Sequence, residues 1–519
     1  MKNPCRFLLC IVVLGLALVA CTADAFDANG EIPKYYLRYL ESRLKTIQAQ
    51  LQEGGDDSHA FYYITDTHPN QNYGKSGFLL SYLSKRLPIH DLIFGGDIGP
   101  STSDKWGEGV SAYEALMKSD SANTKILHSV KPVAKVYRVK GNHDYSVADA
   151  NFWVPDVIYT VGTKVVYRPH GNDDGGLWRC IYSNSDHEWN PSHWQKVSDV
   201  SGYTIDAQVS HSMIMHDAIM NGDIVSPSNV KGCYYYFDRP DAKLRIICLD
   251  TCDTDYGYYG ISNVYYGIAD EQFNWLGNSA LLTTPPDYSL IVVFHIPITK
   301  NTSLSQDYVN RTYANELRSV LNAVNNKNAV SVRGYSFDFS SFTPSIKMVL
   351  NGHTHSDLVT KTNGYFAVSC IGDSYVNEAN PSPLYANLNV PGNKINKKRG
   401  SIREQSFDVV VYDPQNNIIK FLKIGQGIDR YLNLSNVSVK KGAAFTIKTS
   451  LSGEHLHYYC YDANRNHLDE KSKKYTYSQS LAKIDQKGLI HPMEAGEIVV
   501  AIYDLDNDII ELTGITINN

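Results

Sequence analysis

Residues 60–68 read Ala-Phe-Tyr-Tyr-Ile-Thr-Asp-Thr-His, an apolar run that ends in two residue types able to bind metal ions. The apolar run predicts a buried strand over 60–64. Alternate residues of an extended chain point to the same side, so Asp66 and His68 can hold one ion together or flank two. This stretch therefore predicts a strand with a pair of metal ligands at its carboxyl end.

Four more stretches repeat this arrangement. The motifs are Gly95-Gly96-Asp97, Gly141-Asn142-His143-Asp144, His295, and Gly352-His353-Thr354-His355. They follow strands predicted at 92–94, 133–139, 290–294 and 346–350. Helical patterns at 76–87, 109–118, 269–282 and 313–325 separate several strands, which predicts an α/β core with sheets buried between helices. Because the carboxyl ends of strands in such sheets converge on one face, the five motifs are expected to meet there.

The residue types in these motifs point to one chemistry. Asp, Asn and His offer oxygen and imidazole nitrogen ligands, which suit divalent ions such as manganese, zinc and iron. The carboxylate of Asp97 can bridge two ions. Taken singly, each motif has an ordinary structural explanation, such as a turn or a buried core histidine. Five of them in order, each ending a strand, predict a site for two divalent metal ions.

At these residues the sequence resembles the calcineurin-like metallophosphoesterase family, over about 58–380. The resemblance implies a four-layer α/β/β/α sandwich with a dinuclear site at the sheet edge. It implies that one ion is held by Asp66, His68 and His355, that the other is held by Asn142, His295 and His353, and that Asp97 bridges them. His143 would not bind a metal and would contact the scissile phosphate or the leaving group. The implied reaction is hydrolysis of a phosphate ester by a hydroxide that bridges the ions.

Departures from family patterns narrow this expectation. Asp97 is followed by Ile-Gly-Pro-Ser, unlike the Gly-Asp-x-Val-Asp-Arg-Gly of protein Ser/Thr phosphatases. The acidic residue that orients the catalytic histidine there is missing, and Asp144 is our candidate substitute. Pro100 stands where purple acid phosphatases need a tyrosine ligand, which argues against an iron–tyrosinate site. Tyr145, directly after this motif, is the candidate substrate-binding residue.

The remaining sequence suggests five regions. They are a signal peptide (1–20), an N-terminal helix (32–57), the metallophosphoesterase domain (58–380, with an insertion at about 150–240), a linker with peripheral strands (381–430), and a C-terminal β-sandwich (431–519). The last region resembles a bacterial immunoglobulin-like domain of group 2, through Ser438 to Gly442 and Glu494 to Ile498. Such a domain would serve as a spacer or adhesion module.

The insertion is rich in aromatic residues, including Trp153, Trp178, Trp189 and Trp194. On loops near a phosphate site they could stack a base or a sugar. The alternative, which we favour, is that they form a small core of the insertion itself.

The N-terminus has the features of an export signal: Lys2 and Arg6, then an apolar run too short to span a membrane comfortably. Two cleavage sites compete, and we favour the first because Cys21 stands directly after the apolar run. A lipobox ending at Cys21 would give a lipid-anchored outer-membrane or cell-surface protein, whereas Ala23-Asp24-Ala25 would give a periplasmic or secreted one. Six cysteines follow Cys21, so one or two disulfides are expected in an oxidising compartment. Cys248 and Cys252 could instead form a zinc pair, although no second pair accompanies them.

The charge balance bears on partners. The formal net charge is −6, and the longest basic run is Lys397-Lys398-Arg399, so long nucleic acid is not an expected partner. A membrane is expected only through a lipid anchor at Cys21. The sequence thus predicts metal-dependent hydrolysis of a small phosphate mono- or diester outside the cytoplasm. The alternative is a cell-surface binding or adhesion protein built on a phosphoesterase scaffold.

Overall fold

A computed structural model gives the fold of the chain. The structure describes residues 32, 34–68, 75–99, 112–130, 134–144, 151–153, 156–167, 176–199, 207–228, 232–253, 267–298, 311–374, 397–398, 400–463, 466–469 and 474–519. Residues 1–31, which carry the predicted signal and Cys21, lie outside these ranges, as do Tyr145 and residues 381–396 and 399 of the predicted linker.

Two large mixed sheets form the centre of the molecule. The strands of the nine-stranded sheet are, in spatial order, β21 (Leu456–Asp462), β26 (Gly496–Asp504), β27 (Ile509–Asn518), β19 (Asp429–Lys440), β18 (Ile418–Gly425), β17 (Ser406–Asp413), β1 (His59–Ile64), β2 (Asp91–Phe94) and β3 (Lys135–Arg138). Those of the seven-stranded sheet are β15 (Leu358–Thr362), β16 (Tyr365–Ser369), β14 (Ser345–Asn351), β11 (Ser289–Val293), β10 (Leu244–Cys248), β9 (Tyr235–Arg239) and β8 (Ile224–Val225).

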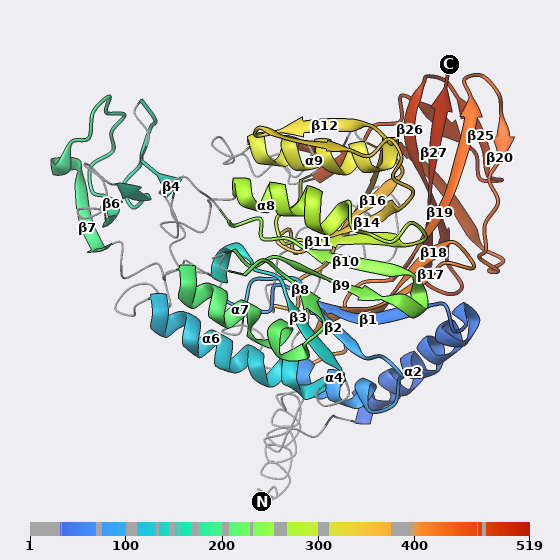
Figure 1. Ribbon diagram of the computed structural model, residues 1–519, viewed down its shortest axis with the longest axis horizontal. Helices are drawn as coiled ribbons and strands as arrows, with labels where there is room; N and C mark the ends of the chain where they lie inside the picture. The colour runs from blue at the N-terminus through green and yellow to red at the C-terminus, as the bar shows by residue number, and fades with distance from the viewer. Residues whose placement is uncertain are drawn as a thin grey trace, which may run out of the picture.

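Helices cover both outer faces of this pair of sheets (Figure 1). On the side of β1 to β3 lie α2 (Lys34–Gly54), α4 (Lys75–Ser84), α6 (Ala112–Leu127) and α7 (Ala207–Asn221). On the other side lie α8 (Asp270–Trp275), continued by a π-helical segment (Leu276–Leu281), and α9 (Arg311–Asn326). The expected four-layer α/β/β/α architecture is confirmed.

The apolar strands explain this layering. Every residue of β2, β10 and β16 is buried, as befits strands covered on both faces. One core cluster combines side chains of both sheets, such as Phe61 and Ile291, with helical ones such as Leu80. A second cluster packs α9, through Leu317, against the outer face of the seven-stranded sheet. The parallel strands β1 to β3 and β10, β11, β14 and β16 are thereby fixed with their carboxyl ends at one edge.

The stretch that the sequence marks as an insertion divides in two. The described residues between 151 and 199 include a separate four-stranded sheet, drawn in teal at one side of Figure 1. Its strands are β4 (Asn151–Phe152), β5 (Lys164–Tyr167), β6 (Gly176–Cys180) and β7 (Trp194–Asp199). Its aromatic side chains pack on one another, with Trp189 stacked on Tyr167 at 3.7 Å between ring centroids. The tryptophans thus form the small core that we favoured. The rest, from α7 onward, belongs to the central layers.

The C-terminal region is a β-sandwich that shares a sheet with the core. Its second layer comprises β20 (Phe445–Thr446), β25 (Leu489–Pro492) and β24 (Ala482–Ile484). A hairpin of β22 (Asn466–Asp469) and β23 (Lys474–Tyr477) precedes β24 in the sequence. Side chains such as Ile490 and Val500 fill the space between the layers. The strand β19 pairs with β18 on one side and with β27 on the other, so the sheet runs unbroken from the core into the sandwich. Apart from these sheets, β12 (Ala329–Val332) and β13 (Tyr335–Asp338) form an antiparallel hairpin that follows α9 in the sequence.

The six described cysteines are buried free thiols, so the expected disulfides do not form among them: Cys180, Cys233, Cys248, Cys252, Cys370 and Cys460. Within the part of the chain that the structure describes, no helix combines the length and the apolar character that a membrane crossing requires.

Candidate metal centre

The five sequence motifs meet at the carboxyl ends of β1, β2, β3, β11 and β14. Five of the seven predicted ligands have a left-handed backbone, with φ between 36° and 67°: Asp66, His68, Asp97, His353 and His355. Non-glycine residues seldom adopt this conformation, which costs on the order of 1–3 kcal/mol for each residue. Such strain persists only where the surroundings impose it, and it is typical of ligand sites. Left-handed residues occur elsewhere in the described chain as well, but five of them are gathered at this one site.

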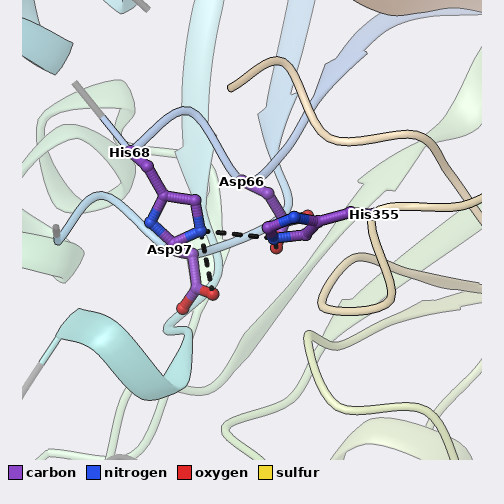
Figure 2. Close-up of side chains that lie close together, drawn as sticks. All are labelled: Asp66, His68, Asp97 and His355. Carbon is purple, nitrogen blue, oxygen red and sulfur yellow. Dashed lines mark hydrogen bonds and ion pairs between the residues drawn. The ribbon is translucent and has the colours of Figure 1, made fainter. Parts of the chain in front are cut away.

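The first group of ligand atoms comes from Asp66, His68, Asp97 and His355, all within 4.8 Å of one another. Figure 2 shows the two imidazole rings directed toward the carboxylates. His68 Nε2 lies 3.3 Å from His355 Nε2 and 3.7 Å from Asp97 Oδ2. His355 Nε2 lies 3.2 Å from Asp66 Oδ1. Two carboxylates and two imidazoles therefore surround one point.

The second group shares Asp97 and adds His295 and His353. His295 Nε2 lies 3.1 Å from Asp97 Oδ2 and 3.2 Å from Asn142 Oδ1. The same amide oxygen lies 2.9 Å from His353 Nδ1. Asn142, which the sequence also predicted as a ligand, is thus beside this group. All seven predicted ligands lie together, and Asp97 belongs to both groups.

Backbone carbonyls fix the orientation of two of the rings. His68 Nδ1 lies 2.7 Å from the carbonyl oxygen of Gly99, and His295 Nδ1 lies 2.7 Å from that of Gly95. A carbonyl only accepts hydrogen bonds, so each Nδ1 carries the proton and donates it. In a neutral ring Nε2 then keeps its lone pair, directed into the site. Metal-binding histidines are commonly held in this way.

Two effects set the pKa values of His68 and His295: burial lowers them, and the Asp97 carboxylate raises them. Burial lowers the pKa of His68 to about 4 against the opposing effect of Asp97, so this ring is neutral at pH 7. Burial lowers the pKa of His353 as well, to about 3. For His295, burial by itself would lower the pKa, but the nearby Asp97 carboxylate outweighs it and raises the pKa to about 9. Despite burial, the imidazoles of His295, His143 and His68 hold the pKa of Asp97 well below its usual value.

These contacts set a fit test for metal ions. The lone pair of the neutral His68 faces the anionic oxygen of Asp97, 3.7 Å away. Acceptors directed at one another repel unless a cation lies between them. The set of carboxylate, amide and imidazole donors suits divalent ions of the zinc and manganese kind. The residues fit a pair of such ions that share Asp97.

Glycines allow this close packing. A Cβ at Gly141 would overlap Asp97 Oδ1 and the Asp97 amide nitrogen, and a Cβ at Gly352 would overlap Thr65 Oγ1 and lie 2.7 Å from Asp66 Oδ2. No side chain larger than hydrogen fits at either position without moving a ligand. The glycines of the motifs are therefore part of the site.

His143 and Asp144 differ in their surroundings. The His143 ring is partly exposed and meets the His68 ring edge to face at 5.0 Å, and it belongs to neither group of candidate ligands in the described chain. Asp144 is buried, and its carboxylate accepts hydrogen bonds from four backbone amides, those of Asp97, Ile98, Gly99 and Gly141. Burial and the nearby Asp97 charge raise the pKa of Asp144 to about 7. These contacts hold the loop of Asp97, while the role of orienting His143 stays a prediction.

Sequence reasoning missed several residues that support the ligands. Thr65 Oγ1 donates to Asp66 Oδ2 at 2.8 Å, and the amides of Asp373 and Ser374 donate to the carbonyls of Thr65 and Asp66. Thr65 directly follows the first strand, which is a usable signal. The loop at 373 follows β16 and carries no recognisable motif.

Comparisons with known proteins add the following. No protein-family model matches the chain, and a sequence search of curated proteins also finds no match. A dimetal phosphatase from Danio rerio aligns at 11% identity over 73% of this chain and 99% of its own, with a TM-score of 0.39. GAP50, the anchor in the inner membrane complex of Plasmodium, aligns at 12% over 70% and 84%, with a TM-score of 0.30. A phosphopantetheinyl hydrolase from Mycobacterium tuberculosis aligns at 12% over 61% and 91%, with a TM-score of 0.21. These scores lie below 0.5, and the case for the metal centre rests on the contacts above.

Proposed function

We propose that this protein is a metal-dependent phosphoesterase with a dinuclear centre. The observation that carries the proposal is the sharing of Asp97 between two groups of ligand atoms, each within 4.8 Å. A carboxylate with one oxygen directed at both groups is suited to bridge two ions. Asp66, His68 and His355 would hold one ion, and Asn142, His295 and His353 the other.

When bound, two such ions supply a water that is deprotonated at neutral pH and positive charge for the phosphate oxygens. The chain's own residues supply the rest. The carbonyls of Gly95 and Gly99 hold His295 and His68 with Nε2 inward, so little reorganisation is needed on loading. We propose that His143 contacts the phosphate and donates a proton to the leaving oxygen, which its partial exposure beside His68 supports.

The substrate we propose is a small phosphate mono- or diester. The net charge of −6 disfavours long nucleic acid, whose backbone would be repelled. The apolar run after Lys2 and Arg6 supports export, and Cys21 directly after it supports a lipid anchor at the outer membrane or cell surface. Cleavage after Ala25 instead would leave the protein periplasmic or secreted.

The test compares the purified protein with its Asp97→Asn variant. The wild type, loaded with Mn²⁺ or Zn²⁺, is expected to bind two ions by elemental analysis and to hydrolyse p-nitrophenyl phosphate or its bis-ester. Comparing these two rates distinguishes a monoesterase from a diesterase. Asp97→Asn removes the charge that both groups share and should lose both metal and hydrolysis.

Asp91→Asn serves as a matched control, because Asp91 is equally buried and charged but begins β2, at the end opposite the site. Wild-type protein that binds none of the metals tried and cleaves neither ester would refute the proposal and leave the binding-protein alternative.

A further inference from the structure

The loop from Gly352 to Asp357 carries two predicted ligands, His353 and His355, in a strained backbone with φ of 67° and 50°. Its first half is tied to the site, because the amide of His353 donates to both oxygens of Asp66 at 3.0 and 3.1 Å. A strained segment keeps its shape only where the surrounding structure holds it. The contacts of Asp357, two residues after His355, are part of what holds that imidazole in place.

Asp357 is fully buried and is the meeting point of several donors. Its Oδ1 lies 2.6 Å from Arg430 Nη1 and 3.6 Å from Lys423 Nζ, and it accepts a hydrogen bond from the amide of Ile371 at 3.2 Å. The segment after Ile371 also touches the site, since the amide of Ser374 donates to the carbonyl of Asp66. One carboxylate thus joins the loop of His355 to a second loop that packs on Asp66.

Arg430 gives this carboxylate its counter-charge. The Arg430 side chain is entirely buried, and its guanidinium bridges Asp357 and Asp408 at 2.6 and 2.9 Å. Lys423 Nζ completes the group at 2.8 Å from Asp408 Oδ2. Two cations therefore face two carboxylates, so the buried group is electrically balanced. Loss of any one member would leave a buried charge without compensation.

The cations of this group come from the sheet that continues into the C-terminal sandwich. Lys423 lies on β18 and Arg430 on β19. On its other edge β19 pairs with β27, with Arg430 opposite Ile510. Arg430, whose side chain binds Asp357 of the loop 352–357, thus lies on a strand that the core and the C-terminal sandwich share.

We propose that Arg430, Asp357, Asp408 and Lys423 form a positioning network for the ligand loop 352–357, and that β19 couples the C-terminal sandwich to metal binding through it. The inference rests on the proposed dinuclear centre and assigns it a support outside the five motifs. Arg430 acts on the ligand loop through its contact with Asp357 and is a positioning residue. The C-terminal strands therefore brace the site, a role that the spacer or adhesion function expected from sequence does not include.

The experiment measures metal affinity and fold stability side by side in the full chain. The variants are Asp357→Asn, which keeps the shape but removes the charge, and Arg430→Lys, which keeps the charge but loses the two-pronged contact. Asp91→Asn is the matched control, because Asp91 pairs with Arg239 at 2.7 Å through two contacts far from the metal loop. Mn²⁺ and Zn²⁺ affinities come from calorimetric titration of the metal-free protein, and stability comes from thermal unfolding followed by circular dichroism.

We expect Asp357→Asn to weaken metal binding by about 10–100-fold, the range typical of residues that orient metal ligands, with a smaller loss in Arg430→Lys. Asp91→Asn should lose stability but keep wild-type metal affinity. Wild-type affinity in folded Asp357→Asn and Arg430→Lys would overturn the network, as would an equal loss of affinity in the control.

The outcomes separate this inference from the proposed function. Wild-type protein that binds two ions but hydrolyses no phosphate ester would refute the function and leave the network testable by affinity. Wild-type protein that binds no metal would overturn both. Where Asp357→Asn fails to fold, the charge-preserving Arg430→Lys variant and amide hydrogen exchange over 352–357 decide the case, since unchanged affinity and protection there contradict the proposal.

Discussion

Replacing Gly141 with alanine tests the geometry of the site with a single methyl group. The new Cβ would overlap the side-chain oxygen and the amide nitrogen of Asp97 and would lie 3.0 Å from its Cα. Real Cβ atoms keep more than 3 Å from such neighbours, so Asp97 or the loop of Asn142 must move by about 1 Å. The Gly141 amide also donates to Asp144 at 2.6 Å, which hinders escape in that direction.

The magnitude follows from this displacement. Overpacking of a rigid site costs about 1–3 kcal/mol of stability. A shift of about 1 Å in a group that positions the reaction costs about 100-fold in rate, or about 2.7 kcal/mol. We therefore expect Gly141→Ala to lose most of its metal affinity and about 100-fold or more of its phosphoesterase rate, with a modest fall in Tm.

The assay combines metal titration, hydrolysis of p-nitrophenyl phosphate and thermal unfolding. Gly334→Ala is the control, because a Cβ there meets nothing within 4 Å, while its φ of 83° imposes its own backbone strain. That variant should lose stability alone. A Gly141→Ala protein with wild-type metal affinity, rate and Tm would show that Asp97 and the loop of Asn142 do not pack as described.

Two more predictions concern other residues. Asp91 is buried, which by itself raises its pKa, but His59 and Arg239 outweigh burial and lower it from 3.8 to about 2, worth about 2.5 kcal/mol of folding free energy. That stability is present above pH 3.8 and is lost as the pH falls through 2. Urea unfolding should therefore show Asp91→Asn to be less stable than wild type by about this amount at pH 6, and the difference in unfolding free energy should shrink below pH 3. A difference that stays constant with pH would contradict this explanation. His143→Asn should lower the hydrolytic rate by about 100- to 10,000-fold at unchanged metal content, and loss of metal instead would make His143 a ligand.

The core elements could be predicted because their sequence patterns are local. The predicted strand at 346–350 is β14 at Ser345–Asn351, and the predicted helix at 313–325 is α9 at Arg311–Asn326. The predicted helix at 269–282 is α8 with its π-helical continuation. A strand that is buried on both faces needs apolar residues at nearly every position. Such an apolar run can be recognised from the sequence of the strand alone, without knowing which strand it pairs with.

The ligands were predictable for a related reason. Asp66, Asp97 and Asn142 stand directly after strands, where parallel strands bring residues together regardless of sequence distance. The residues that hold these ligands in place were harder to predict from the sequence. Asp144 was singled out for its neighbour His143, yet its four described contacts are to backbone amides, and any loop can offer those. A contact to a backbone amide leaves no mark on the sequence of the partner.

The C-terminal region shows the limit of pattern reasoning most clearly. Short strands and glycines after residue 431 indicate a β-sandwich, and a sandwich forms, but the pattern says nothing about which neighbour β19 pairs with. Because β19 pairs with β18 on one edge and with β27 on the other, the domain boundary expected near residue 431 lies in the middle of a sheet. Arg430 offered a hint, since an arginine within a strand of alternating apolar residues is either exposed or paired with a buried acid. Because that acid is Asp357, next to the metal ligands, the architecture of the sandwich and the geometry of the site are one problem, and a variant that loosens the first should be measured on the second.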